Sequence, residues 1–152
     1  MIKNLPNKFT QKFLLAMINE KHKTQYDFFY LPIDFNNKCN IGYAFINFTH
    51  YIYGLQLYSE FHKKDWSHFN SEKICCITYA RIQGKIALID HFQSSKVLCY
   101  QDHSVKPLIF PTCYPNETAI KEIRANFHQR LSYKFCTIAE KEEDKSSSGD
   151  SQ

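Results

Sequence analysis

Asn40-Ile41-Gly42-Tyr43-Ala44-Phe45-Ile46-Asn47-Phe48 is the stretch that decides the fold of this chain. Successive side chains of a strand point to opposite faces of a sheet. One face therefore carries Tyr43, Phe45 and Asn47, and the other carries Ala44, Ile46 and Phe48. We predict that the aliphatic face packs on helices and that the aromatic face is exposed. The other interpretation is an ordinary core strand, in which the aromatic residues reflect only strand propensity.

The last eight residues of this stretch fit the ribonucleoprotein octamer of RNA recognition motifs, K/R-G-F/Y-G/A-F-V-x-F/Y. Five positions match, Ile46 is a near-equivalent of the valine, and only Ile41 departs, where a basic residue is expected. Two exposed aromatic residues in this spacing can each stack an unpaired base, at about 1–3 kcal/mol per base. The octamer therefore predicts Tyr43 and Phe45 as base-stacking residues.

The segments around the octamer predict an α+β fold of the ferredoxin-like split βαβ type. Strands are expected at residues 1–5, 26–31, 42–48 and 73–80. Helices are expected from caps at Thr10 and Thr49 to about Lys21 and Lys63. The order strand-helix-strand-strand-helix-strand gives four antiparallel strands with both helices behind them.

Alternation assigns the remaining side chains of the predicted sheet and helices to faces. In strand 26–31, Phe29 and Leu31 are expected inward, and Phe28 and Tyr30 on the exposed face near Tyr43 and Phe45. In strand 73–80, the inward set is Cys75, Ile77 and Tyr79, and the outward set is Cys76, Thr78 and Ala80. The inward residues expected in the two helices are Phe13, Leu14, Met17, Ile18, Tyr51, Ile52, Leu55 and Tyr58. Trp66 is expected to pin its loop rather than to bind a base.

A C-terminal helical extension follows the predicted fold. We expect a third helix at Gly84 to Phe92, with Ile86, Ile89 and Phe92 on one side, and a short extended piece at Val105 to Phe110. Asn116 is a candidate cap for a basic amphipathic helix to about Lys134. The predicted organisation is 1–81 for the main domain, 82–110 for the extension, 111–135 for the basic helix and 136–152 for a disordered acidic and serine-rich tail.

Composition favours a basic domain in a reducing compartment. Residues 1–135 hold 17 Lys and Arg against 10 Asp and Glu, whereas residues 136–152 hold 2 against 5. A mildly basic surface suits a polyanionic partner. The six cysteines form no C-x-x-C pair and the seven histidines have no metal-ligand spacing, so we expect free thiols, no metal site and no cofactor. The short apolar start is broken by Pro6 and predicts no signal peptide, and no apolar run is long enough to span a membrane.

Several stretches resemble one branch of the RNA recognition motif superfamily, the C-terminal RNA recognition motif of Mei-two-like meiosis regulators. The resemblance covers about residues 1–110 and rests on the octamer and on four further stretches. These are Met1-Ile2-Lys3-Asn4-Leu5-Pro6-Asn7-Lys8, Tyr26-Asp27-Phe28-Phe29-Tyr30-Leu31-Pro32-Ile33-Asp34-Phe35, Phe69-Asn70-Ser71-Glu72-Lys73 and Tyr79-Ala80-Arg81-Ile82-Gln83-Gly84-Lys85. In the first, Asn4-Leu5 fits the end of the second ribonucleoprotein motif, whose aromatic position falls on Met1. The resemblance implies sequence-selective RNA binding, and in some members control of meiosis or differentiation, by a domain that usually ends a longer chain.

The leading hypothesis is a single-stranded RNA-binding module, nuclear or cytoplasmic, with no small-molecule substrate. Tyr43 and Phe45 are expected to stack bases, with the platform extended by Tyr30 and Phe28. Hydrogen bonds to base edges are expected from Asn47 and Thr78, and phosphate contacts from Lys3, Lys38, Arg81 and Lys85. The alternative is a protein-interaction module whose sheet is covered by the third helix, with a protein partner bound through the extension. No motif of an enzyme appears in the chain.

Overall fold

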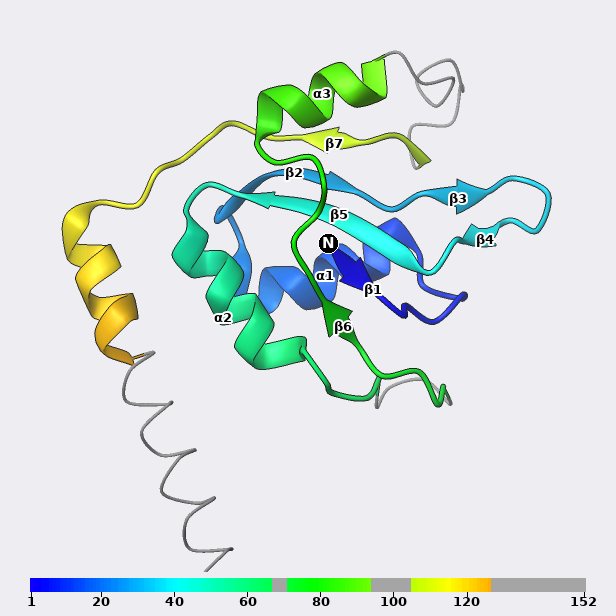
Figure 1. Cartoon of the computed structure of the whole chain (residues 1–152), viewed down its shortest axis with the longest axis horizontal. Helices are drawn as coiled ribbons and strands as arrows, with labels where there is room; N and C mark the ends of the chain where they lie inside the picture. Colours follow the sequence, from blue (N-terminus) through cyan, green and yellow to red (C-terminus); the bar gives the residue numbers. More distant parts are fainter. Residues whose placement is uncertain (67–70, 94–104, 127–152) are drawn as a thin grey trace, which may run out of the picture. The chain divides into compact units, whose positions relative to one another are not determined.

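The computed structural model describes residues 1–66, 71–93 and 105–126 (Figure 1). The chain divides into two units, Met1–Tyr114 and Pro115–Gln152. Within the described residues, the first unit contains the sheet and three helices. In the second unit, residues 117–126 are helical, and the Asn116 side chain accepts a hydrogen bond from the Ala119 amide at 2.8 Å, which is the predicted cap.

The first unit is built on a five-stranded sheet in the order β6-β1-β5-β2-β7, in which every neighbouring pair is antiparallel. The strands are β1 (Ile2–Lys3), β2 (Tyr26–Tyr30), β5 (Tyr43–Phe48), β6 (Cys76–Ile77) and β7 (Leu108–Ile109). A separate two-stranded hairpin consists of β3 (Ile33–Asp34) and β4 (Cys39–Asn40). The octamer strand β5 is therefore central, as predicted. The extended piece at Val105 to Phe110 supplies a fifth strand beyond the four that were expected.

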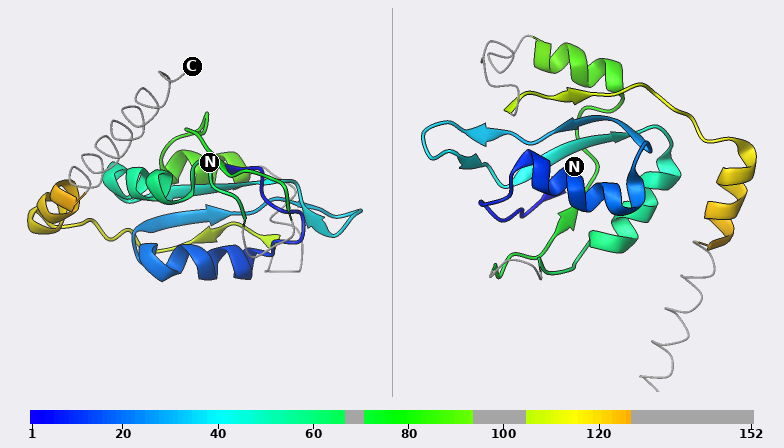
Figure 2. Two further views of the ribbon diagram at one scale, coloured as in Figure 1. Left: turned by 90° about the horizontal axis from the view of Figure 1, so that it is seen from below. Right: turned by 180° about the vertical axis from the view of Figure 1, so that it is seen from behind.

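Two helices lie behind the sheet, α1 (Gln11–His22) and α2 (Tyr51–Phe61). Thr10 caps α1 by accepting a hydrogen bond from the Phe13 amide, as predicted. His50, not Thr49, caps α2, because the Thr49 hydroxyl donates to the carbonyl of Gln25 instead. The third helix, α3 (Lys85–Gln93), lies on the opposite side of the sheet from α1 (Figure 2).

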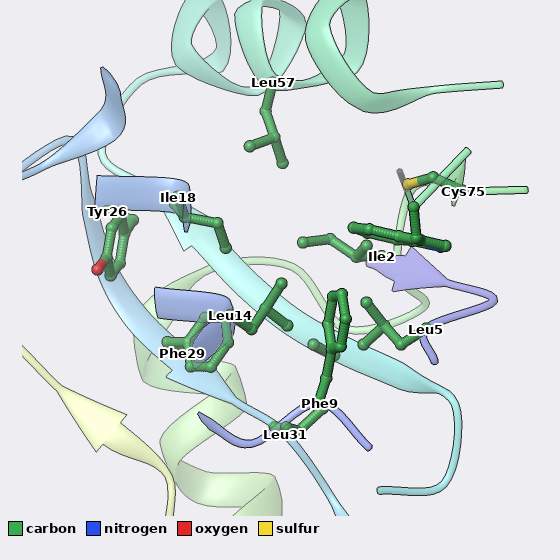
Figure 3. Close-up of a cluster of buried hydrophobic side chains, with 12 residues drawn as sticks. Ile2, Leu5, Phe9, Leu14, Ile18, Tyr26, Phe29, Leu31, Leu57 and Cys75 are labelled. Atoms are coloured by element: carbon green, nitrogen blue, oxygen red, sulfur yellow. The ribbon is translucent and has the colours of Figure 1, made fainter. Parts of the chain in front are cut away.

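The main core fills the space between the sheet and the helices α1 and α2 (Figure 3). Its buried members include Leu14 and Ile18 of α1, Phe29 of β2 and Ala44 of β5. Trp66 is also buried here, and its indole N–H donates to the carbonyl of Asn4 at 2.8 Å, so it pins its loop as expected. The predicted register of β5 is confirmed, because Ala44 is fully buried and both Ile46 and Phe48 pack against this core.

Three tyrosines expected in the core are exposed instead. Tyr51 and Tyr58 of α2 are exposed because the inward row of this helix is Tyr53, Leu57 and Phe61, which are spaced by four residues. Tyr79 is 88% exposed; it follows Thr78, which still exchanges backbone hydrogen bonds with Met1, so the chain leaves the sheet only after Thr78.

Some predictions fall outside the described residues. These are the segment at Phe69, the part of the extension at 94–104, the basic helix beyond 126 and the acidic tail 136–152. Among the described residues, no helix combines the length and the apolar character needed to cross a membrane.

Candidate nucleic-acid interface

The start of β5 is fixed by a buried asparagine. The side-chain amide of Asn40 donates to the carbonyls of Pro6, Phe9 and Asn7 at 2.8, 3.0 and 3.1 Å, and its oxygen accepts from the Gly42 amide at 2.8 Å. Gly42 then adopts a φ of 92°, a left-handed conformation that glycine takes readily. Asn40 and Gly42 thus fix the backbone at which the strand with the outward aromatic residues begins.

One half of the outward sheet face is formed by β1 and the start of β5. Lys3 pairs with Tyr43 on one side and with Cys76 on the other, so these three residues lie side by side across the sheet. All three are partly exposed. The Tyr43 and Phe45 rings meet edge to face, with centroids 5.6 Å apart. We call Lys3, Tyr43, Phe45 and Cys76 the open half of the sheet.

The other half of the same face is covered by α3. Phe28 and Tyr30 point to the predicted face, but they are 0% and 4% exposed, so the expectation that they are accessible is wrong. Phe92 of α3 stacks on Phe28 with an interplanar angle of 17° and meets the Tyr30 ring edge to face at 4.8 Å. Leu88 completes this second buried cluster.

Phe45 marks the boundary between the two halves. It pairs with Tyr30 across the strands, and its ring lies 5.7 Å from that of Phe92. Burial raises the pKa of the Tyr30 phenol above its ordinary value, and the neighbouring Tyr43 adds to this effect. The expected proximity of Tyr30 to Tyr43 and Phe45 is therefore confirmed, although α3 separates Tyr30 from solvent.

A network of hydrogen bonds around Asp27 connects β2 with β5 and with the segment after β7. This residue is the extra one in an irregularity of β2, and its carboxylate accepts from the Asn47 amide at 2.8 Å and from the Thr112 hydroxyl at 2.7 Å. The Lys85 ammonium donates to the carbonyl of Phe110 at 2.6 Å and to the Thr112 hydroxyl at 3.1 Å. Asn47 and Lys85, which were expected to meet RNA, thus make hydrogen bonds within the protein.

Of the remaining predicted residues, Lys38 and Arg81 lie outside the strands of the sheet, whereas Thr78 follows β6 and exchanges backbone hydrogen bonds with Met1. Lys38 is exposed in the turn of the β3–β4 hairpin, and Arg81 is exposed in the segment that leads from β6 to α3. The Thr78 hydroxyl is buried and has no hydrogen-bond partner within the described residues. The hairpin turn is held by Asp34, whose pKa is lowered by a hydrogen bond from the Asn37 side chain and by the Asn36 amide.

The roles of Asn40, Asp27, Thr112 and Leu88 at this face are not evident from the sequence. Asn40 was part of the quoted stretch, but its three carbonyl partners come from a distant loop. Asp27 and its partner Thr112 lie 85 positions apart, so no local pattern connects them. Phe92 was correctly placed on the inner side of the third helix, together with Ile89, but Ile86 is 76% exposed and Leu88 takes its place.

The described cysteines Cys39, Cys75, Cys76 and Cys113 are free thiols. Burial, with a smaller effect of the neighbouring Cys76, raises the pKa of Cys75 to about 12. Among the described residues, no group of three or more His, Cys, Asp or Glu side chains is arranged to hold a metal ion.

Comparisons with known proteins agree with the fold and with the octamer. The family model described as RNA recognition motif 2 matches residues 1–93. The chain is 55% identical over 116 residues to MEI2-like protein 4 of Oryza sativa subsp. japonica. The matched residues make up 76% of this chain and 12% of that protein. It is also 54% identical over 110 residues to MEI2-like protein 3 of Arabidopsis thaliana. Here the matched residues make up 72% of this chain and 14% of that protein.

The fold and the octamer face define an RNA recognition motif, a class of RNA-binding domains that are not enzymes. The chain belongs to the RNA recognition motif 2 family, and within it to the MEI2-like group. It spans only a small part, 12% and 14%, of the length of the two relatives above.

Proposed function

We propose that this chain binds single-stranded RNA on the open half of its sheet. The observation that carries this proposal is the outward pair of octamer aromatic residues, Tyr43 and Phe45, beside the basic residue Lys3. Aromatic rings on a sheet surface stack unpaired bases, and a neighbouring ammonium group suits the phosphate that follows.

The half of the sheet under α3, with Phe28 and Tyr30, limits the number of RNA bases that this face can bind. Phe92 lies nearly parallel to Phe28 and takes the position that a stacked base would need. Phe28 and Tyr30 therefore support the cluster under α3 and do not meet bases. The surface left for stacking consists of Tyr43 and the free edge of Phe45. This surface can stack one or two bases.

Charged residues outside the open half extend the proposed RNA path. Lys38 and Arg81 are exposed and suit phosphate contacts. Lys85 and Asn47 are already hydrogen-bonded to Thr112, Phe110 and Asp27, so we assign them to the support of α3 and β7.

Replacing Tyr43 tests the proposal. Tyr43→Ala is expected to weaken binding of a random-sequence single-stranded RNA by about 1–3 kcal/mol in a fluorescence-anisotropy titration. Its melting temperature is expected to stay close to that of the parent, because the side chain is not part of either buried cluster. Tyr114→Ala is the matched control, since Tyr114 is 77% exposed and lies outside every strand. Equal affinity of Tyr43→Ala and the parent would contradict the proposal.

The second candidate is a protein-interaction module whose sheet is closed by α3, and the contact of Phe92 with Phe28, Tyr30 and Phe45 favours it. Phe92→Ala tests whether α3 covers the sheet permanently or acts as a lid. If α3 is a fixed part of the domain, this variant loses stability and gains no affinity for RNA. If α3 is a lid that excludes RNA, the variant binds RNA more tightly than the parent does.

The likeness to the MEI2-like group supports a regulatory role. We propose that the RNA targets act in meiosis or differentiation and that binding occurs in the nucleus or the cytoplasm. Crosslinking of RNA to the tagged protein in cells, together with imaging of the tag, tests both parts. If the parent protein recovers no more crosslinked RNA than the Tyr43→Ala variant does, the result would count against this role.

A further inference from the structure

Lys3 lies directly opposite Tyr43 on the open half of the sheet. Met1 and Thr78 exchange two backbone hydrogen bonds, at 2.8 and 3.0 Å, so the backbone groups of Met1 face β6. Because backbone groups alternate along a strand, those of Lys3 also face β6 and those of Ile2 face β5. Lys3 and Tyr43 therefore form the type of antiparallel pair that lacks mutual hydrogen bonds, in which the two side chains lie closest together.

The rings of Tyr43 and Phe45 form a corner on this face. They are nearly perpendicular, with an interplanar angle of 85° and centroids 5.6 Å apart. Phe45 also contacts Phe92 of α3, so it closes one side of the space above Tyr43. A base stacked on Tyr43 would therefore be bounded by Phe45 along β5. On the β1 side, the four-carbon stem of Lys3 can bring the ammonium group to the edge of that base.

Few polar groups are available to a base at this corner. Asn47, which was expected to contact a base, already donates to a carboxylate of β2, and the Thr78 hydroxyl is buried. Within the open half, the thiol of Cys76 is only a weak donor and acceptor. The Tyr43 hydroxyl lies in the plane of the ring on which the base would stack, so it does not face the edge of the base. The Lys3 ammonium, with three donors and no acceptor, is the remaining group.

A group that only donates hydrogen bonds distinguishes bases by their exocyclic atoms. Uracil O4 and guanine O6 accept hydrogen bonds, whereas cytosine and adenine carry an amino group, which donates, at the corresponding position. We propose that Lys3 makes the open half selective for a keto base, uracil or guanine, at the position stacked on Tyr43. This inference rests on the proposed RNA binding. It gives Lys3 a contact with the base edge in addition to the attraction of its charge for phosphate.

Octamers of uridine and of cytidine test this selectivity, because the two bases have the same ring size and differ on the edge that carries the exocyclic group. Fluorescence-anisotropy titrations of the chain of residues 1–152 with each labelled octamer measure the two dissociation constants. The parent is expected to bind the uridine octamer about tenfold more tightly than the cytidine octamer, as one good base contact allows.

Lys3→Met keeps the length of the side chain and removes its donors. It is expected to weaken binding of the uridine octamer about tenfold and to bring the two dissociation constants within twofold of each other. Lys3→Gln, which offers both a donor and an acceptor, is a second variant and is expected to lose the preference as well. Lys38→Met is the matched control. Because Lys38 is exposed in the hairpin turn and suits a phosphate contact, its loss is expected to weaken both octamers by the same factor.

Two outcomes would overturn the inference. The first is equal affinity of the parent for the two octamers. The second is an equal loss of affinity for both octamers in Lys3→Met and Lys3→Gln, which would limit Lys3 to a phosphate contact. Tyr43→Ala distinguishes these outcomes from a failure of the proposed function. If this variant binds more weakly than the parent while either outcome is observed, only the selectivity is wrong. If it binds the uridine octamer as tightly as the parent does, RNA binding on the open half is wrong as well.

Discussion

At the scale of single residues, Asn40 fixes the backbone at the start of the octamer strand β5. It is 3% exposed and makes four hydrogen bonds, which join the loop after β1 to the start of β5. A buried amide with every partner in place fixes one backbone arrangement, because each carbonyl would otherwise lose its partner. The orientation of Tyr43 follows from this arrangement.

Asn40→Ala is expected to lower the free energy of unfolding by about 1–3 kcal/mol, since it leaves buried carbonyls and the Gly42 amide without partners. Urea unfolding followed by circular dichroism measures this change. Asn36→Ala serves as the control, because Asn36 is exposed in the hairpin turn and its described hydrogen bond to Asp34 comes from the backbone amide, which the substitution keeps. Equal midpoints for the two variants would show that the amide does not hold this loop.

The faces of individual residues were predictable where a strand is long. Six residues of β5 alternate as the sequence predicts, and its core side is confirmed by Ala44, Ile46 and Phe48. Tyr79 was not predictable by the same rule, because β6 has only two residues and alternation requires a continuing strand. The burial of Phe28 and Tyr30 was also outside the reach of strand periodicity, since it depends on α3.

At the scale of elements, the segment from α3 to β7 is joined to the sheet at several points. Phe92 and Leu88 cover the outward face of β2, β7 pairs with the edge of β2, and Thr112 bonds to Asp27. These interactions join residues that are far apart in the sequence, by 85 positions for Asp27 and Thr112, so no local sequence pattern reveals them. The sequence predicted the helix and the extended piece. It named the sheet as the surface under the helix only in the alternative hypothesis, and it did not predict that β7 pairs with β2.

Thr112→Val keeps the shape of the side chain and removes the hydroxyl that Asp27 and Lys85 share. A destabilisation of about 1–3 kcal/mol is expected, because the buried carboxylate of Asp27 loses one of its two donors. Hydrogen exchange is expected to speed up at β7 more than at β5. Thr118→Val, at an exposed position of the second unit, is the control, and an unchanged β7 would contradict the role given to the network.

At the scale of the whole molecule, the chain divides into two units between Tyr114 and Pro115. Thr112 and Tyr114 belong to the first unit, which ends at Tyr114, so a test of the basic helix must begin at Pro115. Residues 115–135 carry four basic and two acidic residues, whereas residues 136–152 are acidic overall. Residues 115–135 are therefore expected to raise the affinity for RNA, and residues 136–152 are expected to lower it.

Deleting residues 115–152 is expected to reduce the salt dependence of RNA affinity. The log–log slope falls by about 0.7 for each phosphate of a single strand that the shortened chain no longer neutralises. Deleting only residues 136–152 removes negative charge and is expected to raise the affinity without reducing the slope. Anisotropy titrations over a range of salt concentrations measure both. An unchanged slope after the longer deletion would show that the basic helix does not bind phosphate.

The central claim is that the open half of the sheet is the RNA-binding face. An NMR titration of the ¹⁵N-labelled chain with random-sequence single-stranded RNA tests it most directly. The largest amide shifts are expected at Lys3, Tyr43 and Phe45, with smaller ones at Cys76 and Arg81. Shifts concentrated on α1 and α2, with Tyr43 and Phe45 unchanged, would contradict it.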